Sequence, residues 1–315
     1  MRFDASEGQD RPGVFQASAI GVGHLTVSIG YDPIAELRID RLSEGGLDPL
    51  SSGPVFDALQ PGLQHHVDSV KAEVAPDVYE DRDHWDASLK GHWLETLARV
   101  VLRIRDMRHG GAILITPPAP VTGLDVKYKI EYPRLPEALC RWGIATIEKT
   151  HAGDLIGYEL DADEPAIEAG HYLNESVAAS ETEDVESEID GTLWFIACLS
   201  RVDGLVLMGP DLSVYGFGAV ITLEDPPTSI RAARDDTGNP ARPTLLSYEE
   251  FGTRHRSMMR FCSSYPGSVG FVVSQDGDVR AMTRVGDDLV VWNNVRLQRI
   301  LRDHPASEDE LIDSP

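Results

Sequence analysis

The sequence predicts a fold of helices and strands, α/β in the broad sense and α+β in the narrower one, with a mixed central sheet flanked by helices. Apolar residues recur at helical spacing over residues 93–107, and later runs rich in β-branched residues are bounded by turn residues. Some of these runs follow one another directly, whereas others are separated by helical segments, as is typical of a mixed sheet. We expect an additional N-terminal region over residues 1–90.

This N-terminal region is rich in glycine, proline and aspartate and contains only short apolar runs. We expect short strands and loops here, and the alternation in HLTVSIGY, residues 24–31, predicts an edge strand. No motif in this region indicates a chemistry. A partner-binding or regulatory module fits this description.

The middle of the chain gives clearer patterns. The spacing of Leu94, Leu97 and Val101 predicts an amphipathic helix over 93–107, which HGG then ends. AILIT, residues 112–116, is bounded by prolines and predicts a buried strand, and a second helix is expected within 133–147.

A strongly acidic stretch, 161–190, is expected to be a solvated loop or an exposed helix face. After it we expect a buried helix over 191–202 and two strands, 204–209 and 214–223, joined by a PDLS turn. The segment 224–250 is long, polar and rich in proline, and loops of this length are usually functional or disordered.

The last part of the fold begins with a helix over 254–264, for which Thr253 is the expected N-cap. Three runs separated by short turns then predict a meander of strands, over 268–274, 278–285 and 288–292. We therefore divide the chain into an N-terminal region (1–90), a main domain (91–295) and an acidic tail (296–315).

The charge of the chain restricts its partners. With 28 basic and 52 acidic residues the formal net charge is −24, which disfavours nucleic-acid polymers and anionic membranes as partners. A small anionic ligand is still compatible with one local basic cluster, because charges beyond about 10 Å are screened.

Cysteine and histidine usage indicates a cytoplasmic protein without a structural metal. The three cysteines, Cys140, Cys198 and Cys262, are widely spaced and predict neither a disulfide framework nor a thiolate zinc site. The histidines, including the pair His65-His66, lack the spacing of metal ligands and are expected at the surface. We expect no signal peptide and no membrane-spanning segment.

The helix that opens at Thr253 is the first candidate site. Its first turn offers free backbone N–H groups and the positive end of the helix dipole, to which Arg254 and Arg256 add guanidinium groups. His255 adds a donor that titrates near neutral pH. This combination suits a polyphosphate. The alternative is a set of ordinary surface side chains.

Two turns supply further candidates. Asp203 and Gly204 lie where a helix precedes a strand, where a carboxylate can hold a divalent cation or orient a hydroxyl. Ser274 and Asp276 lie in the SQDG turn at another strand end. Each motif alone is also common in ordinary turns.

Together these strings resemble the diadenylate cyclase (DAC) domain. The resemblance rests, in order, on GTLWFIACLSRVDGLVLMGPDLSVYGFGAVI (191–221), GTRHRSMMRF (252–261) and SVGFVVSQDGDVRAM (268–282). It extends over about residues 90–295, where HGGAILIT looks like the start of the domain. GTRHR is fairly specific to the family in this context, whereas the Asp-Gly pair is not.

The resemblance implies that the protein joins two ATP molecules into cyclic di-AMP, with Mg²⁺ or Mn²⁺ and with release of pyrophosphate. Each of two domains, facing one another in a homodimer or higher oligomer, would present one ATP. Asp203 would bind the metal and help to activate the 3′-hydroxyl, and Gly204 would let the nucleotide lie close to the strand. The remaining implied nucleotide-binding residues are Thr253, Arg254, His255, Arg256 and Ser274.

The sequence also departs from the family pattern. The alanine that follows Asp-Gly in the family is Leu205, the glutamate that follows Val-Ser is Gln275, and the connection 224–250 is longer. These departures favour an alternative, a DAC-like sensor that binds a nucleotide or cyclic dinucleotide with little or no turnover.

Overall fold

The computed structural model shows how these segments are arranged in space. It describes residues 15–21, 24–29, 32–38, 41–44, 47–76, 78–79, 82–161, 169–238 and 244–297. The expected acidic tail lies outside this part of the chain from residue 298 onward.

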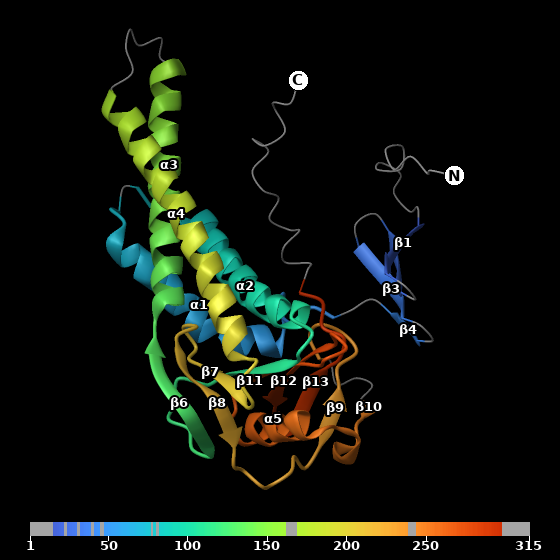
Figure 1. Cartoon of the computed structure of the whole chain (residues 1–315). Helices are drawn as coiled ribbons and strands as arrows, with labels where there is room; N and C mark the ends of the chain where they lie inside the picture. Colours follow the sequence, from blue (N-terminus) through green and yellow to red (C-terminus); the bar gives the residue numbers. More distant parts are fainter. Residues whose placement is uncertain are drawn as a thin grey trace.

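A mixed sheet of nine described strands forms the centre of the protein and confirms the predicted α/β fold (Figure 1). Among these strands, only β5–β7 and β9–β13 pair in parallel. The strands predicted from residue 112 onward all form, within one or two residues. Their order is β10 (Thr244–Leu245), β9 (Ile230–Ala232), β13 (Asp288–Trp292), β12 (Val279–Val285), β11 (Val269–Val273), β5 (Gly111–Ile115), β7 (Leu205–Met208), β8 (Val214–Ile221) and β6 (Leu124–Tyr132).

Helices cover both faces of the sheet, so its central strands are buried on both sides. Alternate side chains point to opposite faces. Phe271 of β11 therefore packs in the core beneath α1 (Pro54–Glu73), α2 (Arg82–Asp106) and α4 (Ala169–Leu199). Its neighbour Val272 packs instead against α5 (Thr253–Ser264). The continuous apolar runs seen in the sequence follow from this double burial.

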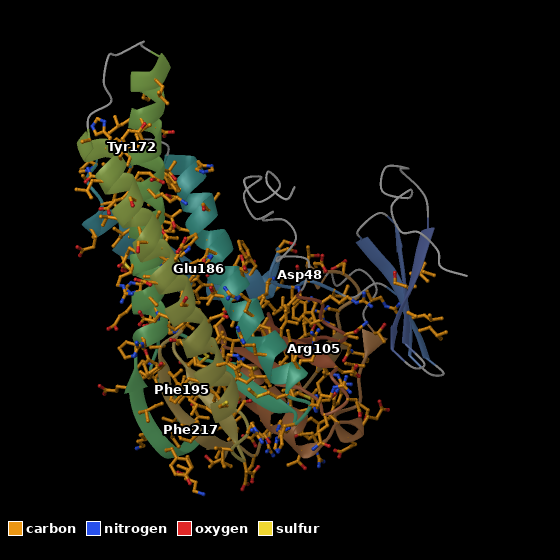
Figure 2. All side chains as sticks on the ribbon, turned by 45° about the horizontal axis from the view of Figure 1, so that its top comes forward. Asp48, Arg105, Tyr172, Glu186, Phe195 and Phe217 are labelled. Carbon is orange, nitrogen blue, oxygen red and sulfur yellow. The ribbon has the colours of Figure 1, made fainter. Side chains whose placement is uncertain are left out.

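α3 (Arg134–Asp161) and α4 form a long helical hairpin that extends well away from the sheet (Figure 1). The described residues of the acidic stretch, 161 and 169–190, are thus helical, in agreement with one of the two expectations. The expected buried helix over 191–202 is the end of α4 and is buried on one face only, since Trp194 and Phe195 are exposed. Figure 2 shows Phe195 near the sheet and Tyr172 towards the far end of the hairpin.

The expected short strands form in the first ninety residues, but their arrangement and the segment that follows them differ from expectation. Four strands, β1 (Phe15–Gly21), β2 (His24–Ile29), β3 (Asp32–Arg38) and β4 (Arg41–Glu44), form a separate antiparallel sheet in which β2 is an inner strand rather than an edge strand. The α1 helix replaces the expected loops and packs in the main core through Leu59 and Leu63. The division expected after residue 90 falls inside α2.

Two further observations concern the helices. No helix in the described ranges is long and apolar enough to cross a membrane. Histidines were expected at the surface, but His66 of α1 and His92 of α2 are both about 5% exposed. His92 stacks on Trp142 with a ring separation of 3.6 Å, so an aromatic neighbour accounts for its burial.

Candidate functional site

The turns that contain Asp203 and Gly110 lie at the same edge of the sheet. In the parallel pair β5–β7, Ile113 is opposite Val206, and the same register carried back three residues aligns Gly110 with Asp203. Adjacent strands are about 4.8 Å apart. The turn that precedes β5 and the turn that precedes β7 therefore border one another.

Ser274 lies at the same edge, on the other side of Gly110. The antiparallel pair β5–β11 aligns Gly111 with Val273, so the residue after β11 is level with the residue before β5. Two strand spacings separate the turns of Ser274 and Asp203, which is about 10 Å in an ideal sheet. A nucleotide's phosphate chain can span this distance.

The start of α5 meets this edge through Arg254. Gly110 has φ of +71°, and a methyl group placed on it would come within 3.1 Å of the Nη1 atom of Arg254. The helix begins at Thr253 with Gly252 as its N-cap and without a side-chain cap, so the expectation that Thr253 is the N-cap is wrong. Thr253 is exposed and occupies the first helical position.

His255 is held by a cation that the sequence did not single out. The Nη1 atom of Arg280, on β12, lies 2.9 Å from the Nε2 atom of His255. A guanidinium group has no acceptor, so Nε2 accepts and the ring carries its proton on Nδ1. Burial, Arg280 and Arg254 lower the pKa of His255 to about 4. His255 is therefore neutral at neutral pH, and the expectation that it titrates there is wrong.

Arg256 points to a different side of α5 from Arg254. Successive helical residues are about 100° apart, and Arg256 faces Glu249, whose Oε2 is 3.6 Å from its Nη1. Its guanidinium also lies 5.9 Å from the ring centre of Tyr248. Together with Arg260 it lines a cavity of about 290 Å³. The three-residue basic cluster is thus divided between two surfaces.

Gly204 allows the start of β7 to lie directly against β8. Its φ is +114°, and a methyl group there would come within 2.5 Å of the backbone of Gly218. Asp203, just before it, is exposed, and in the described part of the chain no hydrogen bond or ion pair involves its carboxylate. This carboxylate is available to a ligand.

The Ser274 hydroxyl has a structural role in the turn after β11. Its Oγ accepts a hydrogen bond from the backbone N–H of Asp278 at 3.0 Å, and the Ser274 N–H donates to the Asp278 carbonyl at 2.8 Å. The hydroxyl proton is still available to a neighbouring oxygen. Gln275 and Asp276, the next two residues, are exposed.

The chain alone supplies few metal ligands here. Among the described residues there is no group of three or more histidine, cysteine, aspartate or glutamate side chains that could hold a metal. Mg²⁺ commonly uses one or two carboxylates and completes its shell with water and substrate phosphates. The lone carboxylate of Asp203 fits a cation that arrives with a nucleotide.

Sequence reasoning missed Gly110 and Arg280. HGG was interpreted as the end of a helix and, by resemblance, as part of the start of the domain, but a positive-φ glycine before a strand also permits close approach of another group. Arg280 is one of two arginines in β12, and a cation next to apolar strand residues is the one signal the sequence offers. Neither residue's neighbours are predictable from local pattern.

A scan of the sequence against models of protein families gives no match, and a search of curated proteins also finds none. The assignment of this site therefore depends on its residues and their geometry.

Proposed function

We propose that the protein is a DAC-like nucleotide-binding protein, which binds ATP at this sheet edge and condenses two ATP molecules to cyclic di-AMP. The observation that carries the proposal is the convergence of the motifs. Asp203, Ser274 and Arg254 come from three segments far apart in sequence, and strand register and the contact at Gly110 bring all three to one edge.

The order of the elements also supports the proposal. The family pattern consists of a helix, a strand opened by Asp-Gly, a hairpin partner, a helix that starts with Gly-Thr-Arg-His-Arg and a strand that ends in Val-Ser. α4, β7, β8, α5 and β11 follow one another in this order, with each motif at the expected end of its element.

The start of α5 supplies the phosphate-binding groups. The first turn has free N–H groups and a positive dipole end, and Arg254 adds a guanidinium beside Gly110. Neutral His255 contributes as an Nδ1–H donor rather than as a cation. Arg256 is on the far side of the helix, so we assign it a smaller contribution to phosphate binding than that of Arg254.

Asp203 would hold a divalent cation together with phosphate oxygens of the nucleotide. The cation, when bound, neutralises phosphate charge, which is the main requirement for attack at phosphorus. The carboxylate also orients the 3′-hydroxyl that attacks the second nucleotide. Because each chain has one such edge, two chains must face one another for the reaction.

A second candidate is a sensor that binds a nucleotide or cyclic dinucleotide without turnover. Gln275 favours it, because an amide replaces a second carboxylate beside Ser274. Leu205 does not add to this argument, since its side chain is 6% exposed and packs in the core beside α5. The cyclase and the sensor would bind the nucleotide at the same place and differ only in whether the reaction is catalysed.

The proposal is tested by incubating the purified protein with ATP and Mn²⁺ and resolving the products by mass. We expect cyclic di-AMP from the wild type and none from Asp203→Asn. Asp154→Asn, an exposed carboxylate of α3, is the matched control and should behave as wild type. Tight binding of ATP without any product, even at high protein concentration, would exclude the cyclase and support the sensor.

Binding itself is tested with arginine variants. The double variant Arg254→Ala with Arg256→Ala should weaken ATP binding at least tenfold, about 1.4 kcal/mol. The single Arg254→Ala should account for most of that loss, because Arg254 faces the sheet edge. Unchanged affinity in a folded double variant would overturn both candidates.

A further inference from the structure

A crevice lies at the opposite end of β5 and β7 from Asp203. It has a volume of about 560 Å³ and is lined by Thr116 after β5 and by Leu207 and Pro210 around the end of β7. These are the carboxyl ends of a parallel pair, where crevices in open α/β sheets commonly bind ligands. It is about 17 Å, or one strand length, from the edge with Asp203.

The walls of this crevice are mostly apolar and conformationally restricted, and their polar members are His65, Thr116, Asp211 and Tyr215. Proline contributes five of the lining residues: Pro61, Pro117, Pro118, Pro120 and Pro210. Gly62 lets α1 close one side, because a methyl group on it would come within 1.7 Å of the Pro210 carbonyl oxygen. Fixed proline rings lose little conformational freedom when a ligand binds, so the crevice is largely preformed.

One carboxylate borders the crevice without a cationic partner. Asp211 accepts hydrogen bonds from the Ser213 N–H at 3.1 Å and the Ser213 hydroxyl at 2.7 Å, which fix its orientation. No described lysine, arginine or histidine forms an ion pair with it. Both of its oxygens have further acceptor capacity.

Tyr215 lies beside this carboxylate. A methyl group placed on Gly209 would be 2.5 Å from the Tyr215 hydroxyl and 2.6 Å from Asp211 Oδ1, so both side chains border the same small space. Burial and the charge of Asp211 raise the pKa of the Tyr215 phenol. Tyr215 is nevertheless 44% exposed as a whole residue, and it lines the crevice with an aromatic side chain.

We propose that this crevice binds an organic cation, an alkylammonium or guanidinium group with a short hydrocarbon chain. The cationic head pairs with Asp211 and lies against the Tyr215 ring, where the ring quadrupole attracts it. The hydrocarbon part packs on the prolines. An anionic ligand is disfavoured by Asp211, and the formal charge of −24 raises the local concentration of cations.

The test uses n-butylammonium and methylguanidinium as probes in an NMR titration of the full chain. Their neutral counterparts, 1-butanol and methylurea, have similar shape without charge. We expect a dissociation constant of about 1 mM for the cations, appropriate to so few heavy atoms. The neutral compounds should bind at least tenfold more weakly.

Two pairs of variants locate the site. Asp211→Asn keeps an acceptor for Ser213 and should weaken cation binding at least tenfold, whereas Asp203→Asn removes a carboxylate at the other end of the strands and should have no effect. Tyr215→Leu should weaken binding about threefold, and Tyr215→Phe, which keeps the ring, should not. Because Asp203 is outside the crevice, this result is independent of nucleotide binding.

The source of the cation is distinguished by a third probe, N-acetyl-lysine-N-methylamide. Tighter binding than n-butylammonium assigns the cation to a side chain of a partner protein, and weaker binding assigns it to a small amine; either supports a cation site. Equal binding of 1-butanol, an unchanged affinity in Asp211→Asn, or no saturable binding of either cation would overturn the proposal.

Discussion

The imidazole of His255 accepts a hydrogen bond from the guanidinium of Arg280, with 2.9 Å between Nε2 and Nη1. This places a neutral ring inside what the sequence presents as a run of three cations. The run therefore contributes two positive charges at neutral pH, and they point to different sides of α5. An additional charge, Arg280, comes from the neighbouring strand β12.

Replacing Arg280 should raise the pKa of His255. In Arg280→Gln we expect the pKa to rise from about 4 and to stay below 6.5, because burial, the largest cause of the shift, is retained. An NMR titration of the His255 ring measures this. Arg284→Gln, on the same strand but paired with Asp287, is the control and should leave the pKa unchanged. An unchanged value in Arg280→Gln would contradict the observed contact.

Gly204 should tolerate no side chain. Alanine there requires φ of +114° and meets the backbone of Gly218, which cannot move away without disturbing β8. We expect Gly204→Ala to lower the free energy of unfolding by about 3 kcal/mol.

The matched control is Gly191→Ala. Gly191 is within α4, is exposed and has no atom within 4 Å of the added methyl group. The Gly191→Ala substitution should raise the free energy of unfolding by roughly 0.5–1 kcal/mol, because alanine favours a helix more than glycine does. Chemical denaturation of both variants checks the pair, and equal stabilities would refute the close approach of β7 to β8.

The parallel pair β9–β13 should depend on one ion pair. Arg231 Nε is 2.6 Å from Asp288 Oδ2, and the arginine side chain is only 7% exposed. Asp288→Asn leaves this buried charge without its counter-ion and should cost roughly 2 kcal/mol of stability. Asp287→Asn, fully exposed next door, should have little effect, and a comparable loss there would argue against this explanation.

The same pair predicts a dependence on pH. Hydrogen bonding from Ser229 and the charge of Arg231 lower the pKa of Asp288. A depressed carboxyl pKa contributes stability above the ordinary carboxyl pKa and loses it as the pH falls through the folded-state value. The difference in stability between wild type and Asp288→Asn should therefore shrink in acid, as measured by denaturation at several pH values.

His66 should destabilise the fold on mild acidification. Burial, followed by the charge of His65, lowers its pKa from 6.5 to about 4. The unfolded chain therefore takes up a proton below pH 6.5 that the folded protein does not. Stability is fully retained above 6.5 and declines between 6.5 and 4, by about 2 kcal/mol from pH 7 to pH 5.

The variant His66→Leu removes the imidazole that takes up this proton in the unfolded chain. It also removes a buried Nε2 atom that has no hydrogen-bond partner in the folded protein. At pH 7 it should match or exceed the wild type in stability, by up to about 1 kcal/mol. Its stability should decline less between pH 7 and pH 5. Identical pH profiles for the two proteins would show that His66 is not buried as described.

Six of the nine described strands of the sheet could be predicted from sequence because they are largely buried on both faces, whereas β6, β9 and β10 were not predicted. Runs such as residues 112–115 and 269–273 contain no polar side chain and have proline, serine or glycine within two residues of their ends, so local pattern alone identifies them. The helix α1 could not be predicted, because Pro61-Gly62 inside it is typical of a helix end. Glycine is needed at position 62 because any side chain there would collide with Pro210, which is distant in sequence.

The candidate site was predictable in its motifs but not in its arrangement. Asp203, Arg254 and Ser274 were singled out by residue type, whereas strand register and the contact of Arg254 with Gly110 bring them to one edge. Strand order depends on long-range packing, which no single segment contains. The neutral state of His255 was not predictable for the same reason, because Arg280 is 25 residues further along the chain.

The hairpin of α3 and α4 leaves the body after β6 and returns just before β7. Only its inner part, including Leu139 and Val185, joins the main core, whereas Tyr158 and Tyr172 in the outer part are exposed. Insertions or deletions of whole helical turns there leave every strand partner unchanged. The outer hairpin is thus a suitable attachment point for a fluorophore or an affinity tag, because a label there is remote from both ends of β5 and β7.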